Sequence, residues 1–435
     1  MGSVAFMLFL ILRLRIHAFL SLLMTSIFLG FLVGMPMDSI IKSVIEGMGS
    51  TLGYVAIIIG IGAIFGQMLE SSKGAESLAQ YLIKKFGKKN APYSLATTGF
   101  IIATPVFFDV GFIILVPILY AMTRESKKSL LYFSIPLLAG LAVAHAFIPP
   151  TPGPLATAAI LGVDLGWVLL FGILIGIPVT LLAGPIFGKY ISKKIVLQVP
   201  NTFEATDDDV IRKLPSFSLV LAIILVPIVL IIANTVSNAM GLDHFLVRLL
   251  SFVGHPIVAL LIATLIAIYA LGVKRGFTPD SIFKLSAKAL APAGIIILVT
   301  GAGGVFKQLI VDSGIGMQLA ESMAHSALPP LVLAYVIAMI MRVSQGSATV
   351  AMLTSAAIVS PLLSSFVLSE PHKALVVISI AAGATMASHV NDSGFWIVGK
   401  YLGMNEKQTL QSWTVMTSII SVSGFSMALI LSFFF

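Results

Sequence analysis

The sequence predicts an all-α polytopic membrane protein built from two inverted-topology repeats, and two observations carry this prediction. The first is composition: 58% of the 435 residues are hydrophobic and only 10% are charged, whereas a soluble domain carries about 25% charged residues. The second is internal similarity: residues 60–160 align without a gap on residues 301–401, at a constant offset of 241. Two weakly similar hydrophobic halves are typical of secondary transporters, whose site lies between the halves.

The hydrophobic residues occur in long runs, for example 257–273 and 412–435. A membrane-spanning helix needs about 18 residues or more of this kind. Because lipid offers no hydrogen-bond partners to the backbone, only helices and closed barrels span membranes. The sequence lacks the alternating segments of about ten residues that a barrel requires, so we expect helices.

Charge and cysteine usage exclude several function classes. The net charge of +8 comes from basic residues between the apolar runs, which indicates topology control rather than nucleic-acid binding. Without cysteine, the chain has no disulfide, thiolate metal site or thiol nucleophile. Zinc-protease, Walker and nucleophile-elbow motifs are also absent. We therefore expect no enzyme activity, no metal site and no organic cofactor.

The first repeat is expected over residues 1–187. Within it, residues 91–122 hold two apolar arms around 104–109, each of roughly 12 residues and so too short to cross a core of about 30 Å. Both flanks are basic, which predicts a re-entrant hairpin. The next apolar run is interrupted at 148–154 by four prolines, which cannot stay helical, so we expect a broken helix over 130–163.

The second repeat is expected over residues 216–435, after a cytoplasmic linker at 188–215. It repeats the order of the first. A second hairpin is predicted over 330–363, with its tip at 342–349. A second broken helix is predicted over 373–400, with its interruption at 389–394.

Loop charges indicate that the two repeats have opposite orientations. The loop 73–90 before the first hairpin contains a run of lysines, and its counterpart 324–330 contains none. The loop 35–50 is poor in basic residues, and its counterpart 273–289 is rich in them. Since basic loops stay in the cytoplasm, equivalent loops lie on opposite sides. The two hairpins then enter from opposite faces, and their tips can meet at the midplane.

Four interruptions therefore lie at membrane depth, and these carry the candidate substrate site. Unwound segments free backbone groups, and helix N-termini that point inward favour an anion or a hydroxyl-rich ligand. Helix packing explains many single Gly/Ser clusters, but four clusters in two-fold register favour a site. The candidate substrate-binding residues are Thr151, Arg342, Ser347, Ala348, Thr349, Asn391, Asp392 and Ser393.

Ionisable groups at membrane depth are functional candidates because they are costly to bury. We assign proton coupling first to Asp109, which aligns with Val350 in the other repeat and is therefore not a symmetric structural feature. His145, which titrates near neutrality, is the second candidate. Asp109 as a helix cap or hairpin brace, and His145 as a structural hydrogen-bonded residue, are the alternatives.

The roles of the two other charged candidates stay open at this stage. Arg342 can pair with a substrate carboxylate, neutralise Asp109 or Asp392, or lie toward the membrane interface. Asp392 can cap the following half-helix or bind substrate hydroxyls. An intramembrane enzyme would need a nucleophile and a base, such as Ser347 with a histidine, but the spacing does not support this pairing. A passive channel is a further alternative.

Several motifs resemble those of the gluconate permease family of the ion transporter superfamily, and together they cover nearly the whole chain. They are GSTLG (49–53), FDVGF (108–112), HAFIPPTPGP (145–154), LIVDSG (309–314), GSATVA (346–351) and SHVNDSGFW (388–396). Two positions depart from the family pattern. Members often have Glu where Asp109 stands and His where Thr151 stands.

The resemblance implies proton-coupled uptake of gluconate or a related sugar acid across the bacterial inner membrane, with H⁺ as the coupling ion. It also implies a homodimer with a scaffold domain and a moving transport domain that holds both hairpins, as in elevator-type alternating access. The family has a branch that is specific for D-serine, so a permease for D-serine or another small hydroxy or amino acid is the alternative. Arg342 and the segment 389–392 look more like the sugar-acid branch.

Overall fold

The computed structural model describes all residues except 1–2, 4–5, 8, 88–89, 127, 201–213, 241–243, 315–328, 364–365, 367 and 391. Every regular element in the described residues is a helix. Seven of these helices are long and apolar enough to cross a membrane. The predicted fold class, an all-α polytopic membrane protein, is confirmed. The inverted relation between the two repeats stays a prediction.

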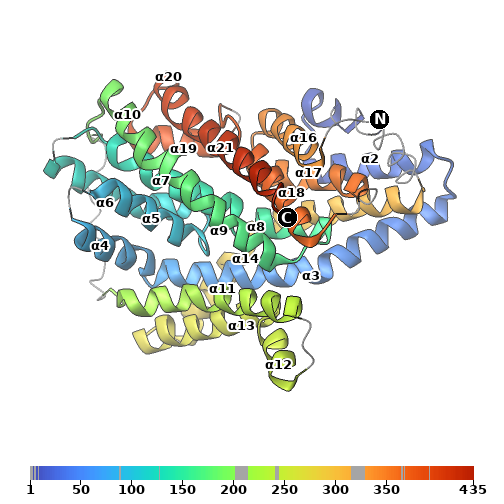
Figure 1. Ribbon diagram of the computed structural model, residues 1–435, viewed down its shortest axis with the longest axis horizontal. Helices are drawn as coiled ribbons and strands as arrows, with labels where there is room; N and C mark the ends of the chain where they lie inside the picture. Colours follow the sequence, from blue (N-terminus) through green and yellow to red (C-terminus); the bar gives the residue numbers. More distant parts are fainter. Residues whose placement is uncertain are drawn as a thin grey trace.

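Two long helices, α3 (Met37–Ser71) and α14 (Pro279–Asp312), pack along each other through the middle of the molecule (Figure 1). A Cβ atom at Gly304 would lie 2.7 Å from the carbonyl oxygen of Gly47, so this contact requires glycine. With 35 and 34 residues, each helix is about 50 Å long and extends beyond the hydrocarbon core. For this reason most of the segments 35–50 and 273–289, predicted as loops, are helical.

The first half contains one hairpin and one broken helix. Helices α5 and α6 form the hairpin, and α7 packs against α5. Helices α7 and α8 form the broken helix, which is interrupted at 148–151. The elements are α2 (Ala18–Leu32), α4 (Gly74–Phe86), α5 (Ala91–Ala103), α6 (Phe108–Ser126), α7 (Leu131–Phe147), α8 (Pro152–Leu161), α9 (Leu165–Leu181) and α10 (Phe187–Lys194).

The second half repeats this arrangement. Helices α16 and α17 form a hairpin, α18 packs against α16, and α18 and α19 are separated by an interruption at 384–392. The elements are α11 (Phe217–Met240), α12 (Phe245–Val253), α13 (Pro256–Ala267), α16 (Pro330–Gln345), α17 (Ala348–Leu363), α18 (Glu370–Gly383), α19 (Ser393–Leu402), α20 (Glu406–Thr409) and α21 (Val415–Leu431). A short π-helix, η6 (Leu410–Thr414), joins the last two.

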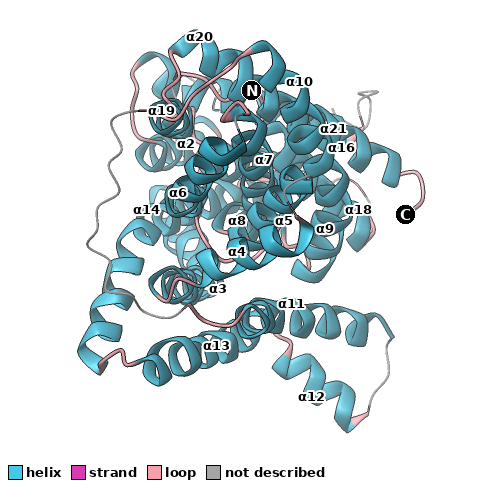
Figure 2. Ribbon diagram, turned by 90° about the vertical axis from the view of Figure 1, so that its left-hand side faces the viewer, coloured by secondary structure: helices cyan, strands magenta, loops and turns pink. Residues whose placement is uncertain are grey.

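The hairpins and broken helices lie on one side of α3, and α11, α12 and α13 lie on the other (Figures 1 and 2). The first broken helix forms the interior. In its most apolar window 83% of the residues are buried, against 33–56% in the other six candidate spans. A helix that is buried on all sides contacts protein rather than lipid, so interruptions in it can be tolerated.

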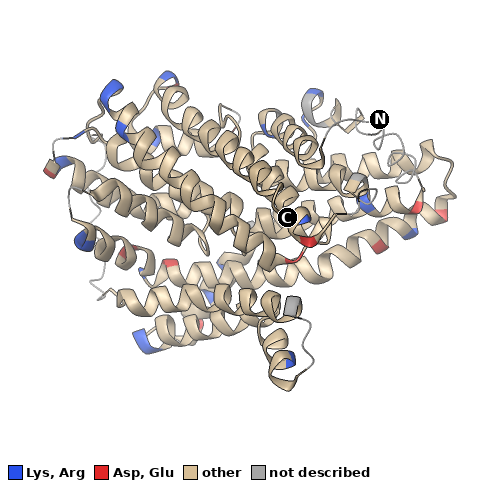
Figure 3. Ribbon diagram, viewed as in Figure 1, with Lys and Arg blue, Asp and Glu red and all other residues tan. Residues whose placement is uncertain are grey.

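Basic residues gather at one end of the molecule, the left-hand end in Figure 3. Helix α4 ends with Lys84 and Lys85, α6 ends with Arg124, and α10 ends with Lys193 and Lys194. The positive-inside rule predicts that this end faces the cytoplasm. The first residues of the expected linker 188–215 belong to α10, and 201–213 lie outside the described residues.

Candidate substrate-binding site

Three helices begin in the wall of one cavity, which we call the central cavity. They are α6 of the first hairpin, α17 of the second hairpin, and α19 of the second broken helix. The cavity encloses about 210 Å³. Its lining residues are Phe107, Phe108, Asp109, Ala142, His145, Ala146, Ile296, Arg342, Ser347, Ala348, Thr349, Thr385, Asp392, Ser393, Gly394, Trp413 and Thr417. Three helix N-termini turn the positive ends of their dipoles toward this cavity, which makes it suited to an anion.

An ion pair joins the second hairpin to the second broken helix. The Nη2 atom of Arg342 lies 2.5 Å from Oδ2 of Asp392, and the two side chains are only 4% and 13% exposed. The Nη1 atom of Arg342 donates to the carbonyl oxygen of Gly346. The guanidinium therefore braces the hairpin tip from within, and it neutralises Asp392 rather than Asp109.

Asp392 uses both carboxylate oxygens within the protein. Its Oδ1 accepts from the N–H of Gly394 at 3.1 Å and so caps α19. Its Oδ2 accepts from the hydroxyl of Ser388 as well as from Arg342. Trp413 of the π-helix η6 donates to that hydroxyl across 2.6 Å. The capping role is thus observed, and contact between Asp392 and substrate stays a prediction.

The tip of the second hairpin presents small polar groups to the central cavity. Gly346 ends α16 in the left-handed conformation, with φ of +81°, which favours glycine. The hydroxyl of Ser347 accepts weakly from the N–H of Val350 at 3.4 Å, at the start of α17. Ser347, Ala348 and Thr349 line the cavity together, so a ligand can approach both hydroxyls and backbone amides.

Asp109 lies in the first turn of α6 and is half-buried. Within the described part of the chain, its carboxylate has no hydrogen-bond or ion-pair partner. His145 lines the same cavity near the end of α7, and its buried Nδ1 atom has no hydrogen-bond partner. Within the described residues, neither group braces the hairpin through a hydrogen bond, and the coupling role of both stays a prediction.

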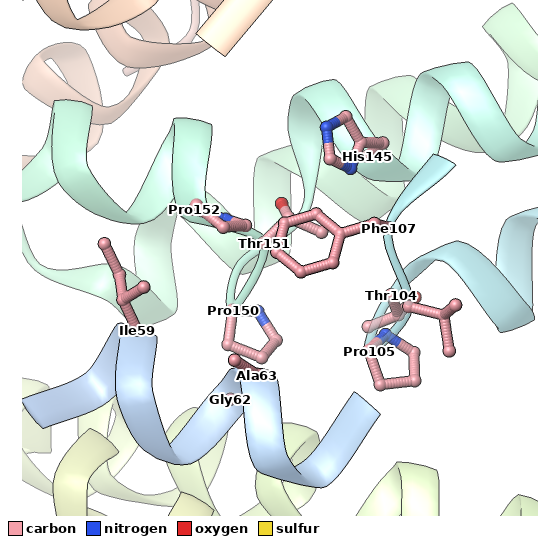
Figure 4. Close-up of a pocket in the computed structure, with 11 residues that line it drawn as sticks. Ile59, Gly62, Ala63, Thr104, Pro105, Phe107, His145, Pro150, Thr151 and Pro152 are labelled. Atoms are coloured by element: carbon pink, nitrogen blue, oxygen red, sulfur yellow. The ribbon is translucent and has the colours of Figure 1, made fainter. Parts of the chain in front are cut away.

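Thr151 lies apart from the other predicted substrate residues. It lines a separate small pocket of about 20 Å³ at the first break, which we call the proline pocket (Figure 4). Its hydroxyl donates to the carbonyl oxygen of Ile148 across 2.6 Å. Phe107 and His145 line both this pocket and the central cavity. Asn391, also predicted, lies outside the described residues.

Sequence reasoning missed several residues of the central cavity. Thr385 follows the end of α18, Ile296 lies within α14, and Trp413 and Thr417 belong to the C-terminal segment. Only Thr385 had a local signal, because it lies four residues before the predicted interruption at 389–394; the observed interruption begins earlier and includes it. The π-helix at Trp413 is a feature often found at functional sites, but no sequence pattern marks it. In the described residues, no group of three His, Asp or Glu side chains is placed to bind a metal ion.

A sequence profile described as GntP family permease matches residues 1–434. The chain belongs to the GntP permease family. The predicted family resemblance is confirmed, and so is the expectation that the protein is not an enzyme. Its family and its apolar helices make this GntP permease a multi-pass protein of the bacterial inner membrane.

Two characterised relatives are similar over almost their whole length. The low-affinity gluconate transporter of Escherichia coli (strain K12) is 39% identical, with 97% of this chain and 95% of that protein covered. The gluconate permease of Pseudomonas aeruginosa is 38% identical, with 97% and 94% covered.

Among solved structures, the YdaH transporter of Alcanivorax borkumensis superposes with a TM-score of 0.64 at 14% identity. The match covers 92% of this chain and 90% of that one. At this identity the likeness shows a shared fold alone, which agrees with the arrangement of hairpins and broken helices described above.

Proposed function

We propose that this GntP permease takes up gluconate or a closely related sugar acid together with protons. The observation that carries the proposal is the convergence of three helix N-termini and several hydroxyls on the central cavity. A sugar acid presents one carboxylate and a chain of hydroxyls, which matches these groups. The names of the relatives, a gluconate transporter and a gluconate permease, support the same substrate class.

The substrate carboxylate would lie against the start of α17, where Ser347, Ala348 and Thr349 offer amides and hydroxyls. Arg342, already paired with Asp392, would hold this tip in place through its hydrogen bond to the carbonyl oxygen of Gly346. The sugar hydroxyls would reach Thr385, Thr417 and Ser393 on the opposite wall. A site with hydrogen-bond partners for hydroxyls discriminates strongly against acids that lack them, because its own polar groups would be left unpaired.

The charges in the central cavity support proton coupling. Its titratable residues are Asp109, His145, Arg342 and Asp392. Because Arg342 and Asp392 neutralise each other, an ionised Asp109 would leave the cavity negative. The carboxylates of Asp109 and of the substrate would then repel each other. For two like unit charges about 7 Å apart, this costs about 2 kcal/mol at an effective dielectric constant of about 20. A proton on Asp109 would remove this repulsion, so proton and anion would favour each other's binding.

We further propose an elevator-type mechanism in a homodimer. Helices α3 and α14, with α11 to α13, would form the scaffold, and the hairpins and broken helices would form the moving unit. The two hairpins lie toward opposite ends of the molecule in Figure 1, which supports an inverted repeat, and one tip would close each access path. Cross-linking in native membranes tests the dimer. A chain that still migrates only as a monomer after cross-linking would contradict it.

The experiment that tests the function is labelled gluconate uptake into proteoliposomes, with and without an inward proton gradient. We expect accumulation above equilibrium that a protonophore abolishes. Downhill entry without accumulation would favour a passive channel. Unlabelled D-serine should compete poorly. If it competes better than L-idonate or other sugar acids, the D-serine alternative replaces the sugar acid.

A further inference from the structure

A second cavity lies beside the central one, and we propose that it is a transit site that binds the transported hydroxylated carboxylate between the central cavity and the cytoplasm. This inference rests on the proposed uptake function. We call the second cavity the basic-side cavity. It encloses about 240 Å³, and α3, the first hairpin and α14 supply its walls. The residues that carry the argument are Gln67, Glu70, Phe107, Lys288 and Ala289.

The two cavities lie in series along α14. Lys288 and Ala289 line the basic-side cavity, and Ile296 lines the central cavity. Ile296 lies seven positions after Ala289, which corresponds to about 10 Å along a helix. Since α14 begins at Pro279, the basic-side cavity is the one nearer to the start of this helix.

The start of α14 lies on the cytoplasmic side. Lys274 and Arg275 lie just before it in the chain, and three residues separate Arg275 from its first residue, Pro279. On the opposing wall, Glu70 is the penultimate residue of α3, and the next helix, α4, ends with two lysines. Basic residues at these helix ends mark the cytoplasmic face. A solute that leaves the central cavity toward the cytoplasm along α14 therefore meets the basic-side cavity next.

Phe107 separates the two cavities. Its side chain lines the central cavity, the basic-side cavity and the proline pocket. The hairpin tip that carries it is seated tightly, because a Cβ atom at Gly66 would lie 2.2 Å from the carbonyl oxygen of Pro105. The ring centroid of Phe107 lies 6.3 Å from that of His145. Because Phe107 belongs to the wall of each cavity, a rotation of its ring would connect the two.

The basic-side cavity offers partners for a sugar acid, but fewer than the central cavity does. Lys288 is exposed and, within the described residues, has no carboxylate at salt-bridge distance, although its charge acts on the carboxylate of Glu70 in the same cavity. The Nε2 atom of Gln67 donates to Glu70 and to Ser71, each at 3.1 Å. The ammonium can attract the carboxylate, and Glu70 can accept from hydroxyls. A site on an exit path must bind weakly enough to release its ligand, and one exposed cation whose charge Glu70 partly offsets fits this requirement.

The test compares Lys288→Gln with Lys284→Gln, in proteoliposomes of known orientation. Lys284 is an exposed lysine one turn earlier on α14 that does not line the cavity. Half-saturating gluconate concentrations are measured separately from each face. We expect Lys288→Gln to raise the value for the cytoplasmic face about three- to fivefold and to leave the outer value unchanged. Equal shifts on both faces, or no shift, would overturn the proposal.

A second variant tests the barrier. Phe107→Ala should join the cavities, so that preloaded gluconate leaves faster down its gradient and proton-driven accumulation falls. Slower efflux with full accumulation would contradict the role of the ring. If the wild-type protein transports no gluconate at all, the proposed function itself is refuted. Wild-type transport with face-independent effects of Lys288→Gln would refute only the transit site.

Discussion

Lys307 donates a hydrogen bond across 2.7 Å to the carbonyl oxygen of Ile160, and so links α14 to the C-terminal end of α8. The hydroxyl of Ser360 donates to the same oxygen at 3.2 Å. A cation at a helix C-terminus is favoured by the helix dipole and by the free carbonyls there. The residue aligned with Lys307 in the first repeat is Gly66, which meets the hairpin tip instead. Equivalent positions on the two long helices thus make different contacts.

Replacement of Lys307 should therefore destabilise the protein. Lys307→Met keeps the length of the side chain but removes the charge and the donor, which should cost about 1–2 kcal/mol. Thermal unfolding in detergent measures the effect, and Lys307→Arg should retain most of the stability. The exposed Lys284→Met provides the control. If both methionine variants unfold at the same temperature, the contact contributes nothing.

Removal of one charge of the Arg342–Asp392 pair should lower the stability of the protein more than removal of both charges. Asp392→Asn leaves a buried guanidinium without its counter-ion, which should cost about 3 kcal/mol. Arg342→Met combined with Asp392→Leu removes both charges and should recover part of the thermal stability without recovering uptake. Size-exclusion profiles and uptake assays separate the two effects. A double variant as unstable as the single one would argue against a paired charge.

Asp109→Asn should separate substrate exchange from proton-driven accumulation. The amide is neutral like the protonated acid, so the cavity still accepts the anion, but no proton can be released. Gluconate counterflow should persist while accumulation driven by a pH gradient is lost. The matched control is Asp38→Asn, an exposed position at the start of α3. Accumulation at the wild-type level in Asp109→Asn would show that another group carries the proton.

The separate locations of Thr349 and Thr151 predict different effects of the same substitution. Thr349→Val removes a hydroxyl from the central cavity and should raise the KM for gluconate about tenfold. Thr151→Val removes a hydroxyl that is already bonded to Ile148 in the proline pocket, and KM should change less than about twofold. Initial-rate measurements with both variants decide the point. The opposite ranking would place the substrate at the first break.

Local sequence signals were sufficient to locate the helix ends that matter. The prolines between Ile148 and Pro154, and Gly346 with its small neighbours, disfavour continuous helix by their own conformational limits. The structure ends α7 and α16 beside these residues. The sequence signal for a helix was weaker where the first helical turns are polar and only the later ones are apolar. For this reason the starts of α3 and α14 were predicted as loops. A short helix without buried residues in its described range, α12, was not predicted.

The sequence by itself determined the class of protein, the positions of the chain breaks and the family, because these depend on composition, on local backbone chemistry and on linear motifs. Only the tertiary structure decided which candidates share one cavity. It paired Arg342 with Asp392 rather than with Asp109, placed Thr151 apart, and brought Thr417 to the site from a distant helix. The physical reason is that contacts between helices far apart in the chain depend on how their faces pack, and hydropathy alone does not encode that packing.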